Sequence, residues 1–256
     1  MILLAFVCVG AGVEAIFSWA HARGWYEWRD TELTLGLAFG WLVGGAIATS
    51  LEIWVMSSGY NHRIAHWGAA PLGLPLAFLL SDLIYYLWHR LSHVWPWLWA
   101  SHFPHHTAQR MNVLASLRQG WTDALSGTWL FWLPLALLGF SPEQIGAYFA
   151  VLLAVQALAH NEWASKWGPI EWVFVTPSHH RVHHSLEAAH FDHNFGGVLI
   201  VWDRLFGTLA LEGSRQVREF GLPGFDANRC NPLAIATQGW RDLGVEIVRR
   251  VGARAA

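Results

Sequence analysis

Long apolar runs separated by shorter polar segments form the main pattern along the chain. Each run approaches the length of about 20 helical residues that crosses a hydrocarbon core roughly 30 Å thick. We therefore expect membrane-spanning helices over residues 1–20, 33–57, 70–88, 121–140 and 143–160. Between the last two, Ser141 can cap the following helix and Pro142 suits its first position, which predicts a tight helical hairpin.

The first apolar run has two other interpretations. Ala20-His21-Ala22 imitates a cleavage site, so residues 1–20 could be a signal peptide, although no basic segment precedes them. The run also holds the string Gly10-Ala11-Gly12-Val13-Glu14-Ala15, which imitates a dinucleotide-binding fingerprint. That fingerprint requires a βαβ unit, and the next segment is another apolar run. We therefore expect four to five spans, with small residues easing helix contact in the first.

The polar segments differ in charge between the two sides of the predicted bundle. Alternating the spans places residues 21–32, 89–120 and 161–256 on one side, and residues 58–69 and the 140–142 turn on the other. Of the 16 Lys and Arg residues, only Arg63 lies on the second side. Because basic residues favour the cytoplasmic side of a membrane, we assign the first side to the cytoplasm.

Composition favours a membrane protein and excludes several other classes. Of the 256 residues, 54% are hydrophobic and only 13% are charged, whereas a soluble domain carries about a quarter charged residues. The formal net charge of −2 offers no positive field for a nucleic-acid backbone, so nucleic acid is excluded as a partner. Cys8 and Cys230 predict no disulfide framework. We expect an all-α integral membrane protein with a histidine-rich cytoplasmic cap.

Histidine is the unusual residue, because 15 are present and nine of them lie in three clusters. The first cluster ends the third apolar run, where His89 and His93 stand four positions apart and share one helix face. Two imidazoles in this arrangement can reach one metal ion. Asp82 lies on the same stripe, and we expect its carboxylate to accept the second ring N–H of a ligand.

The second cluster consists of His102, His105 and His106. The residue before a proline avoids the helical region, so a helix is expected to begin at Pro104, with His102 just ahead of it. The three rings would then converge from a helix entrance and its first turn.

The third cluster follows a clear helix start, with Thr176 as the expected N-cap and Pro177 as the first helical residue. Three of its members repeat the i, i+3, i+4 spacing of the second cluster: His180, His183 and His184. The fourth, His179, is interpreted as a hydrogen-bonding neighbour rather than a ligand. One more histidine, His160, ends the fifth run on the same side, as either an interfacial side chain or a further ligand.

This number of imidazoles exceeds the roughly four to six ligands that one ion accepts, so the clusters imply two metal ions. Imidazole binds zinc, iron, copper and nickel, which leaves the metal open. The chain lacks HExxH, GxSxG, P-loop and CxxC motifs. Metals at a lipid boundary without hydrolytic motifs favour oxygen activation against an unactivated C–H bond.

Four segments of the sequence resemble the fatty acid hydroxylase and sterol desaturase superfamily. They are DLIYYLWHRLSH from Asp82, HFPHH from His102, TPSHHRVHH from Thr176 and DHNFGGVLIVWDRLFGT from Asp192. The resemblance covers about residues 78–210. Leu117-Arg118-Gln119 and Gly168-Pro169-Ile170-Glu171 are most similar to the alkylglycerol monooxygenase branch and its bacterial relatives.

The resemblance implies a non-haem di-iron site that uses O2 to hydroxylate or desaturate a lipid. It assigns metal-ligand roles to the eight histidines of the three motifs and to the histidine between the second and third: His89, His93, His102, His105, His106, His180, His183, His184 and His160. Some members carry another histidine shortly after the last of these, where this chain has Ala164. Asp192 and Asn194 match the family's D-x-N and would orient ligands or shape a turn.

Electrons would come from an external donor, since no haem-binding or flavin-binding segment is visible; reduced pterin, a cytochrome and a ferredoxin are the candidates. The substrate would be a membrane lipid, an alkylglycerol-type ether lipid if the nearest resemblance holds. Alternatives are a sterol or fatty acyl desaturase or hydroxylase, or an ornithine-lipid hydroxylase. From another class, a zinc-dependent membrane hydrolase would use Glu162 or Glu187 as its base.

We divide the chain into N-terminal transmembrane helices over residues 1–69, a catalytic domain over 70–210 and a cytoplasmic tail with a short helix over 211–256. The prevalence of Arg over Lys suggests a GC-rich bacterial source. We therefore expect the protein in a bacterial inner membrane, with its active site on the cytoplasmic face.

Overall fold

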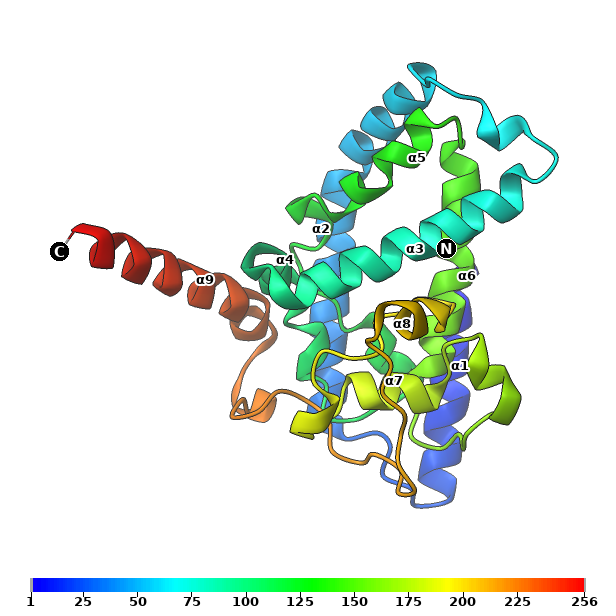
Figure 1. The fold of residues 1–256 in the computed structure, drawn as a ribbon. Coiled ribbons are helices and arrows are strands. Elements are labelled where there is room, and N and C mark those ends of the chain that lie inside the picture. The colour runs from blue at the N-terminus through cyan, green and yellow to red at the C-terminus, as the bar shows by residue number, and fades with distance from the viewer. Residues whose placement is uncertain (1, 256) are drawn as a thin grey trace.

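The computed structural model describes residues 2–255, and within them the chain is helical apart from connecting segments and two isolated β-bridges. Short 3-10 turns join the α-helices (Figure 1). The helices are α1 (Ile2–Ala20), α2 (Trp28–Asn61), α3 (Gly73–Val94), α4 (Pro96–His102), α5 (Leu133–Leu137), α6 (Pro142–Ala159), α7 (Pro177–His183), α8 (Val201–Phe206) and α9 (Pro232–Ala255). This agrees with the all-α class expected from the sequence.

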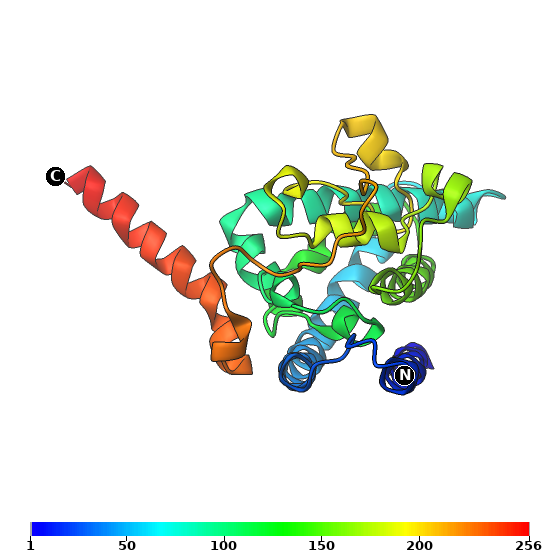
Figure 2. The same ribbon diagram turned by 90° about the horizontal axis from the view of Figure 1, so that it is seen from below.

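Two of the described helices, α2 and α6, are long and apolar enough to cross a bilayer. Helix α1, with 19 residues, is also largely apolar and runs in the same direction (Figure 2). Figure 2 looks along the axes of α1, α2 and α6, and α3 lies across that direction rather than parallel to it. The structure therefore departs from the expected set of spans, because α3 crosses the bundle and brings its C-terminal end to the centre.

The apolar run at residues 121–140 is also not the continuous span that we expected. It is divided into the 3-10 turns Ala124–Ser126 and Thr128–Trp132 and the single short helix α5. Gly127 and Gly139 have φ values of +82° and +90°, which right-handed helix does not allow, and Pro134 lacks the amide hydrogen that a continuing helix needs. Hydrophobicity predicted the run correctly as apolar, but these residues break its helix.

The hairpin turn before α6 forms as predicted. Ser141 accepts a hydrogen bond from the amide of Gln144, whose side chain in turn accepts from the amide of Ser141, and Pro142 occupies the first helical position. The same turn bonds the 58–69 segment, because the amide of Ile64 donates to the carbonyl of Leu137 at 2.8 Å. These two segments were expected on one side of the bundle, and they lie together.

Helix α1 is fastened to the body by a buried carboxylate. Glu14 accepts hydrogen bonds from the amide of Val113 at 2.7 Å, the hydroxyl of Tyr26 at 2.7 Å and the indole of Trp163 at 2.9 Å. The glycine-rich string around Glu14 lies inside the helix, with Gly10 against Val113. It therefore forms no turn that cradles a dinucleotide, and a Cβ added at Gly12 would meet nothing within 4 Å, so close helix contact is not the reason for that glycine.

Two buried ion pairs brace the segments that carry the histidines. Arg118 is fully buried and donates to Asp30 at 2.8 Å, which joins the chain after the second cluster to the start of α2. Arg181 lies inside the third cluster and donates to both oxygens of Glu212, at 2.8 and 2.7 Å. It also donates to two backbone carbonyls of residues 161–164, so its guanidinium ties α7 to the chain after α6.

Replacement of Arg181 by Ala should lower the free energy of unfolding by about 3–5 kcal/mol, because Glu212 would keep a buried charge without its partner. Arg229→Ala is the matched control. The pair that Arg229 makes with Asp226 is exposed and should contribute at most about 1 kcal/mol. Denaturant unfolding of both variants in detergent micelles measures the difference, and equal losses would contradict this role for Arg181.

Candidate metal centre

Nine histidines from four parts of the fold meet in the interior. They come from the last turns of α3, from the end of α4 and the 3-10 turn after it, from the residue that ends α6, and from α7 and the residue that ends it. Their ring nitrogens form two groups, and within each group the atoms lie within 4.8 Å of one another. The first histidine group is His89, His93, His102, His106 and His183, and the second is His105, His160, His180 and His184.

The two groups are interleaved, because the second and third clusters each contribute to both. In the second cluster, His102 and His106 join the first group, whereas His105 joins the second group. In the third cluster the division is reversed: His180 and His184 join the second group, and His183 joins the first. Each cluster therefore supplies a pair at i, i+4 spacing to one group and a single ring to the other.

The spacing of the nitrogens matches the edge of a coordination shell. Two nitrogens at right angles around one ion, each about 2.1 Å from it, lie about 3.0 Å apart. In the first group the Nε2 atoms of His102 and His106 are 3.1 Å apart. In the second group His180 Nε2 lies 3.0 Å from His160 Nε2 and 3.2 Å from His184 Nε2. Lone pairs at these distances can share one cation.

Backbone carbonyls hold four of the rings by their other nitrogen. Each Nδ1 donates to a main-chain oxygen: His89 to Phe195 at 2.9 Å, His105 to Arg118 at 3.1 Å, His160 to Gln156 at 2.7 Å and His183 to His193 at 2.8 Å. A proton fixed on Nδ1 leaves Nε2 as the free lone pair, which is the usual arrangement around a metal-bound histidine. The pattern accounts for the tautomer of rings in both groups.

Several ring nitrogens in the groups are buried without any protein partner. These are Nε2 of His89, His93 and His183, and Nδ1 of His184. Burial, together with the neighbouring His93, lowers the pKa of His183 to about 3. Burial also lowers the pKa values of His105, His106, His180 and His184. The rings are therefore neutral near pH 7 with unshared lone pairs, and they fit a pair of metal ions.

The local structure of the second cluster differs from the prediction. We expected a helix from Pro104, but α4 ends at His102 and a separate 3-10 turn covers His105–Thr107. Instead, Pro96 begins α4 about two helical turns before the expected start, and this short helix brings His102 toward the first group. The break between the two elements lets His105 face the second group while its neighbours face the first.

The third cluster begins as predicted only in part. Pro177 occupies the first position of α7, but Thr176 makes no side-chain cap. The hydroxyl of Thr176 donates instead to Glu171 at 3.0 Å and lies 3.3 Å from Nδ1 of His179. His179 lies outside both groups among the described residues, which agrees with its interpretation as a neighbour.

Asp82 is placed differently from the prediction. Among the described residues its hydrogen bonds come from the hydroxyl of Tyr148 at 2.9 Å, the indole of Trp202 at 2.9 Å and the amides of Val198 and Leu199 at 2.9 and 3.1 Å. None of the nine rings donates to it. Asp82 instead fixes the loop that begins at Phe195, whose carbonyl holds His89. It acts on the centre through this backbone.

The D-x-N residues shape the turn around His193. Asp192 and Asn194 have φ values of +59° and +60°, a conformation that Asp and Asn tolerate better than other side chains. Between them, the carbonyl of His193 points at His183. Asp192 also lies 3.5 Å from Nδ1 of His93. This contact with His93 lowers the pKa of Asp192. Asn194 donates to the carbonyl of His179 at 3.0 Å.

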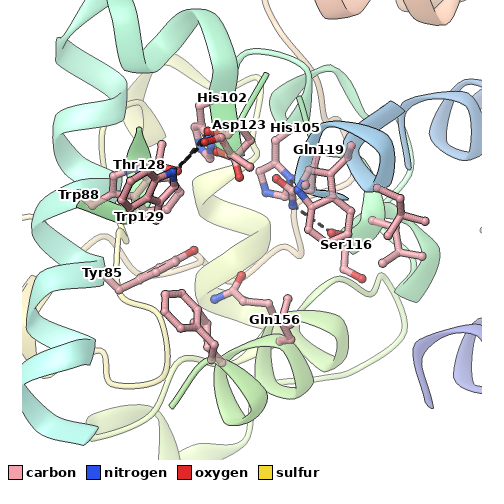
Figure 3. A pocket seen from close by; sticks show the side chains of 18 of the residues that line it. Tyr85, Trp88, His102, His105, Ser116, Gln119, Asp123, Thr128, Trp129 and Gln156 are labelled. Atoms are coloured by element: carbon pink, nitrogen blue, oxygen red, sulfur yellow. Dashed lines mark hydrogen bonds between the residues drawn. The ribbon is translucent and has the colours of Figure 1, made fainter. Parts of the chain in front are cut away.

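A cavity of about 560 Å³ lies beside the two groups and is walled by α2, α3, α6 and the segment from residue 116 to residue 132. Three rings reach it: His102 from the first group and His105 and His160 from the second. Figure 3 shows His102 and His105 on one wall, with Gln156 facing them. Aromatic and aliphatic side chains form most of the wall, and Glu52 and Asp123 are its carboxylates.

Comparisons with known proteins show which family the chain resembles. The model of the fatty acid hydroxylase family matches residues 74–208. Alkylglycerol monooxygenase of Danio rerio is 42% identical over 56% of this chain and 31% of its own length. Ornithine lipid hydroxylase OlsE of Rhizobium tropici is 30% identical over 77% of this chain and 61% of its length. Human cholesterol 25-hydroxylase is 26% identical over 57% of this chain and 59% of its own length.

The chain therefore spans between 31% and 61% of the length of these relatives. No solved structure matches the chain. The family model begins one residue after α3 starts and ends after α8, so it covers the elements that carry all nine histidines.

Asp82→Asn should lower the free energy of unfolding by about 1–3 kcal/mol, because the new amide group would face buried donors instead of accepting from them. Asp242→Asn is the exposed control, since that carboxylate bonds only a surface glutamine. Denaturant unfolding of the two variants in micelles checks the prediction. An unchanged stability in Asp82→Asn would mean that the loop does not depend on this carboxylate.

Proposed function

The chain belongs to the fatty acid hydroxylase family, and from this premise we propose that it is a membrane-bound oxygenase that hydroxylates a C–H bond of a lipid. One oxygen atom of O2 enters the C–H bond and the other leaves as water. The reaction consumes an electron pair and protons from outside the chain. The observation that carries the proposal is the pair of interleaved histidine groups at the wall of a largely apolar cavity.

Two iron ions are the metals that we propose, one for each histidine group. Bound iron would supply the activation of O2, which organic side chains cannot perform. The imidazoles hold the ions, and the carbonyls of residues 118, 156, 193 and 195 orient the rings. Asp192, with a side chain that is 65% exposed, orients His93 from the outer edge of the centre.

The cavity is the proposed substrate site. Its volume of about 560 Å³ falls within the range of ligand pockets, roughly 300–1,000 Å³. An alkyl chain gains about 0.8 kcal/mol for each CH2 that it buries, and this energy can hold one carbon against the wall formed by His102, His105 and His160. The apolar side chains of the surrounding helices exclude water from the reacting carbon.

An ether lipid of the alkylglycerol type is the substrate that we favour, because the relative from Danio rerio carries that substrate in its name. Hydroxylation next to an ether oxygen gives a hemiacetal, which breaks to an aldehyde and an alcohol. A reduced pterin is then the proposed donor, with a cytochrome or a ferredoxin as alternatives. Hydroxylation or desaturation of a sterol or fatty acyl chain and ornithine-lipid hydroxylation are the other candidates within this class.

We place the centre on the cytoplasmic face of a bacterial inner membrane, on the basis of the basic residues in the segments around it. The proposed division of the chain keeps residues 70–210 as the catalytic part, although Trp41 and Glu52 of α2 also line the cavity. Residues 1–69 would then act both as membrane helices and as one wall of the substrate site, and residues 211–256 as the tail.

The zinc hydrolase alternative is not supported by the positions of its candidate bases. Glu162 is buried and accepts from the amide of Met111 at 3.1 Å, while Glu187 is exposed at the surface. Neither belongs to a histidine group or to the wall of the cavity. Neither of these two residues could therefore act as the base for a hydrolytic water at this wall, where the carboxylates are Glu52 and Asp123.

His105→Ala and His183→Ala remove one ring from each histidine group. Each variant should lose at least half of the bound iron and all measurable hydroxylation, because a missing ligand leaves too few imidazoles in a buried site. Elemental analysis and O2-dependent product formation measure both effects. His193→Ala is the control: its ring lies outside the groups, and its carbonyl, which holds His183, is retained.

Zinc in place of iron, with turnover that needs no O2, would contradict the oxygenase proposal. Unchanged iron in both ligand variants would instead contradict the ligand set. Comparative lipid mass spectrometry of cells with and without the gene under ¹⁸O2 identifies the substrate.

Gly45→Leu should shorten the chain length that the enzyme accepts. Gly45 lines the cavity, and a Cβ added there meets nothing within 4 Å, so a larger side chain can occupy substrate space without disturbing the fold. Gly146→Leu is the control, because Gly146 has equally open space but does not line the cavity. Turnover of lipids with graded chain lengths should shift in the first variant only, and an unshifted preference would place the substrate elsewhere.

A further inference from the structure

Helix α9 consists of a packed first part and an outer part with few neighbours. In the first part, Ile235 and Ala236 are buried against Leu33 and Leu37 of α2. Toward its C-terminal end the helix projects outward from the body (Figure 1). Side chains there are open to their surroundings, among them Ile247, which is 53% exposed. The packed part fixes the direction of the outer part.

The outer part of α9 is amphipathic. Four of its apolar residues stand at i, i+3, i+7 and i+8 and therefore share one face: Trp240, Leu243, Ile247 and Val248. A fifth, Val245, lies toward the opposite face. Asp242 and Arg249 lie on the opposite face, both exposed. Ile247 and Val248 are both exposed in the part of the chain that the structure describes, and they would be costly to leave in water, so the stripe calls for an apolar partner.

The position of α9 relative to the bundle points to a membrane surface. In Figure 2, which looks along α1, α2 and α6, α9 lies in the plane across their axes. Pro232 packs directly on Gly36, at the beginning of the apolar segment of α2 that starts at residue 33. The helix thus begins against the body where α2 becomes apolar, which is the level of a bilayer interface.

The charged and aromatic residues of the outer part are those that favour a bilayer interface. Arg241 and Arg249 are exposed on the outer part, and the sequence continues with Arg250 and Arg254, against Asp242 and Glu246 of opposite sign. This excess of positive charge suits anionic headgroups. Near the start of the outer part, Trp97 and Trp240 stack edge to face at 4.8 Å, and indole rings favour the interface.

We propose that the outer part of α9 lies in the bilayer interface, with the face of Trp240, Leu243, Ile247 and Val248 against anionic lipid. The occupant of the stripe is then the lipid surface rather than a second copy of the chain. Because the packed part of α9 joins α2 and α4, and α4 ends at His102, this contact sets the height of the metal centre above the hydrocarbon.

A site-specific probe of lipid contact tests the proposal. The full chain, with Cys8→Ser and Cys230→Ser, carries an environment-sensitive fluorophore at Ile247→Cys or, as the matched control on the opposite face, at Asp242→Cys. Each protein is placed singly in nanodiscs of phosphatidylglycerol or phosphatidylcholine that contain a lipid-borne quencher. We expect blue-shifted emission and several-fold stronger quenching at residue 247 than at residue 242, with a smaller difference in phosphatidylcholine.

Equal quenching at both positions, or water-like emission at both, would overturn the proposal. Emission that shifts only when two copies share a disc would assign the stripe to self-association and also overturn it. Arg249→Gln, which leaves the apolar face intact, should weaken quenching at residue 247 in phosphatidylglycerol and leave it unchanged in phosphatidylcholine. Bound metal, measured in every variant, checks that the body of the protein is folded.

Discussion

The structure depends on one constraint: many imidazoles must be held close together, neutral and with one nitrogen bare. Such a cluster is unfavourable by itself, since buried rings lose hydration and unpartnered nitrogens lose hydrogen bonds. The fold compensates by giving Nδ1 of four rings a backbone carbonyl, supplied by residues 118, 156, 193 and 195. The bare nitrogens then keep lone pairs that the proposed metal ions would accept.

The carbonyls can serve this purpose only if their own segments are rigid, and the buried polar residues provide that rigidity. Arg118 offers its carbonyl to His105 while its guanidinium is bound to Asp30. Asp82 and Asp203 hold the loop that carries the carbonyl of Phe195, Asp203 through the amides of Phe195 and Gly196 at 2.8 Å each. Irregular backbone therefore surrounds the centre, and buried carboxylates fix the segments that supply the carbonyls of Arg118 and Phe195.

The sequence predicted the site better than it predicted the spans. Repeated spacing brought the histidines together because i, i+3 and i+4 positions share a helix face, whatever the exact bounds of the helix. The span expected over residues 121–140 was wrong, because apolar content does not reveal a run broken by Gly127, Pro134 and Gly139. The helix expected over residues 70–88 forms as α3, which lies across the bundle, and its role as a span stays a prediction.

The carbonyl anchors were missed for a different reason. A main-chain oxygen has no residue type, so no motif reports Phe195 or Gln156 as a partner. The D-x-N pattern was the one available signal. Two residues that tolerate positive φ on either side of a single position indicate that the backbone carbonyl of that position is held in a particular direction. The prediction for Asp82 was wrong for a related reason. We expected its carboxylate to accept a hydrogen bond from a histidine ring, because it lies on the same helix face, whereas backbone amides and an indole donate to it instead.

The interleaving of the two histidine groups has a mechanical consequence. His105 and His106 are adjacent in sequence and belong to different groups, with ring centroids 5.5 Å apart and planes at 90°. His183 and His184 repeat this arrangement at 5.1 Å and 87°. Two single peptide units thus join the groups, and a peptide unit is planar and stiff. We infer that substitutions in the cavity wall, away from these residues, would change the shape of the proposed lipid site without moving the histidines.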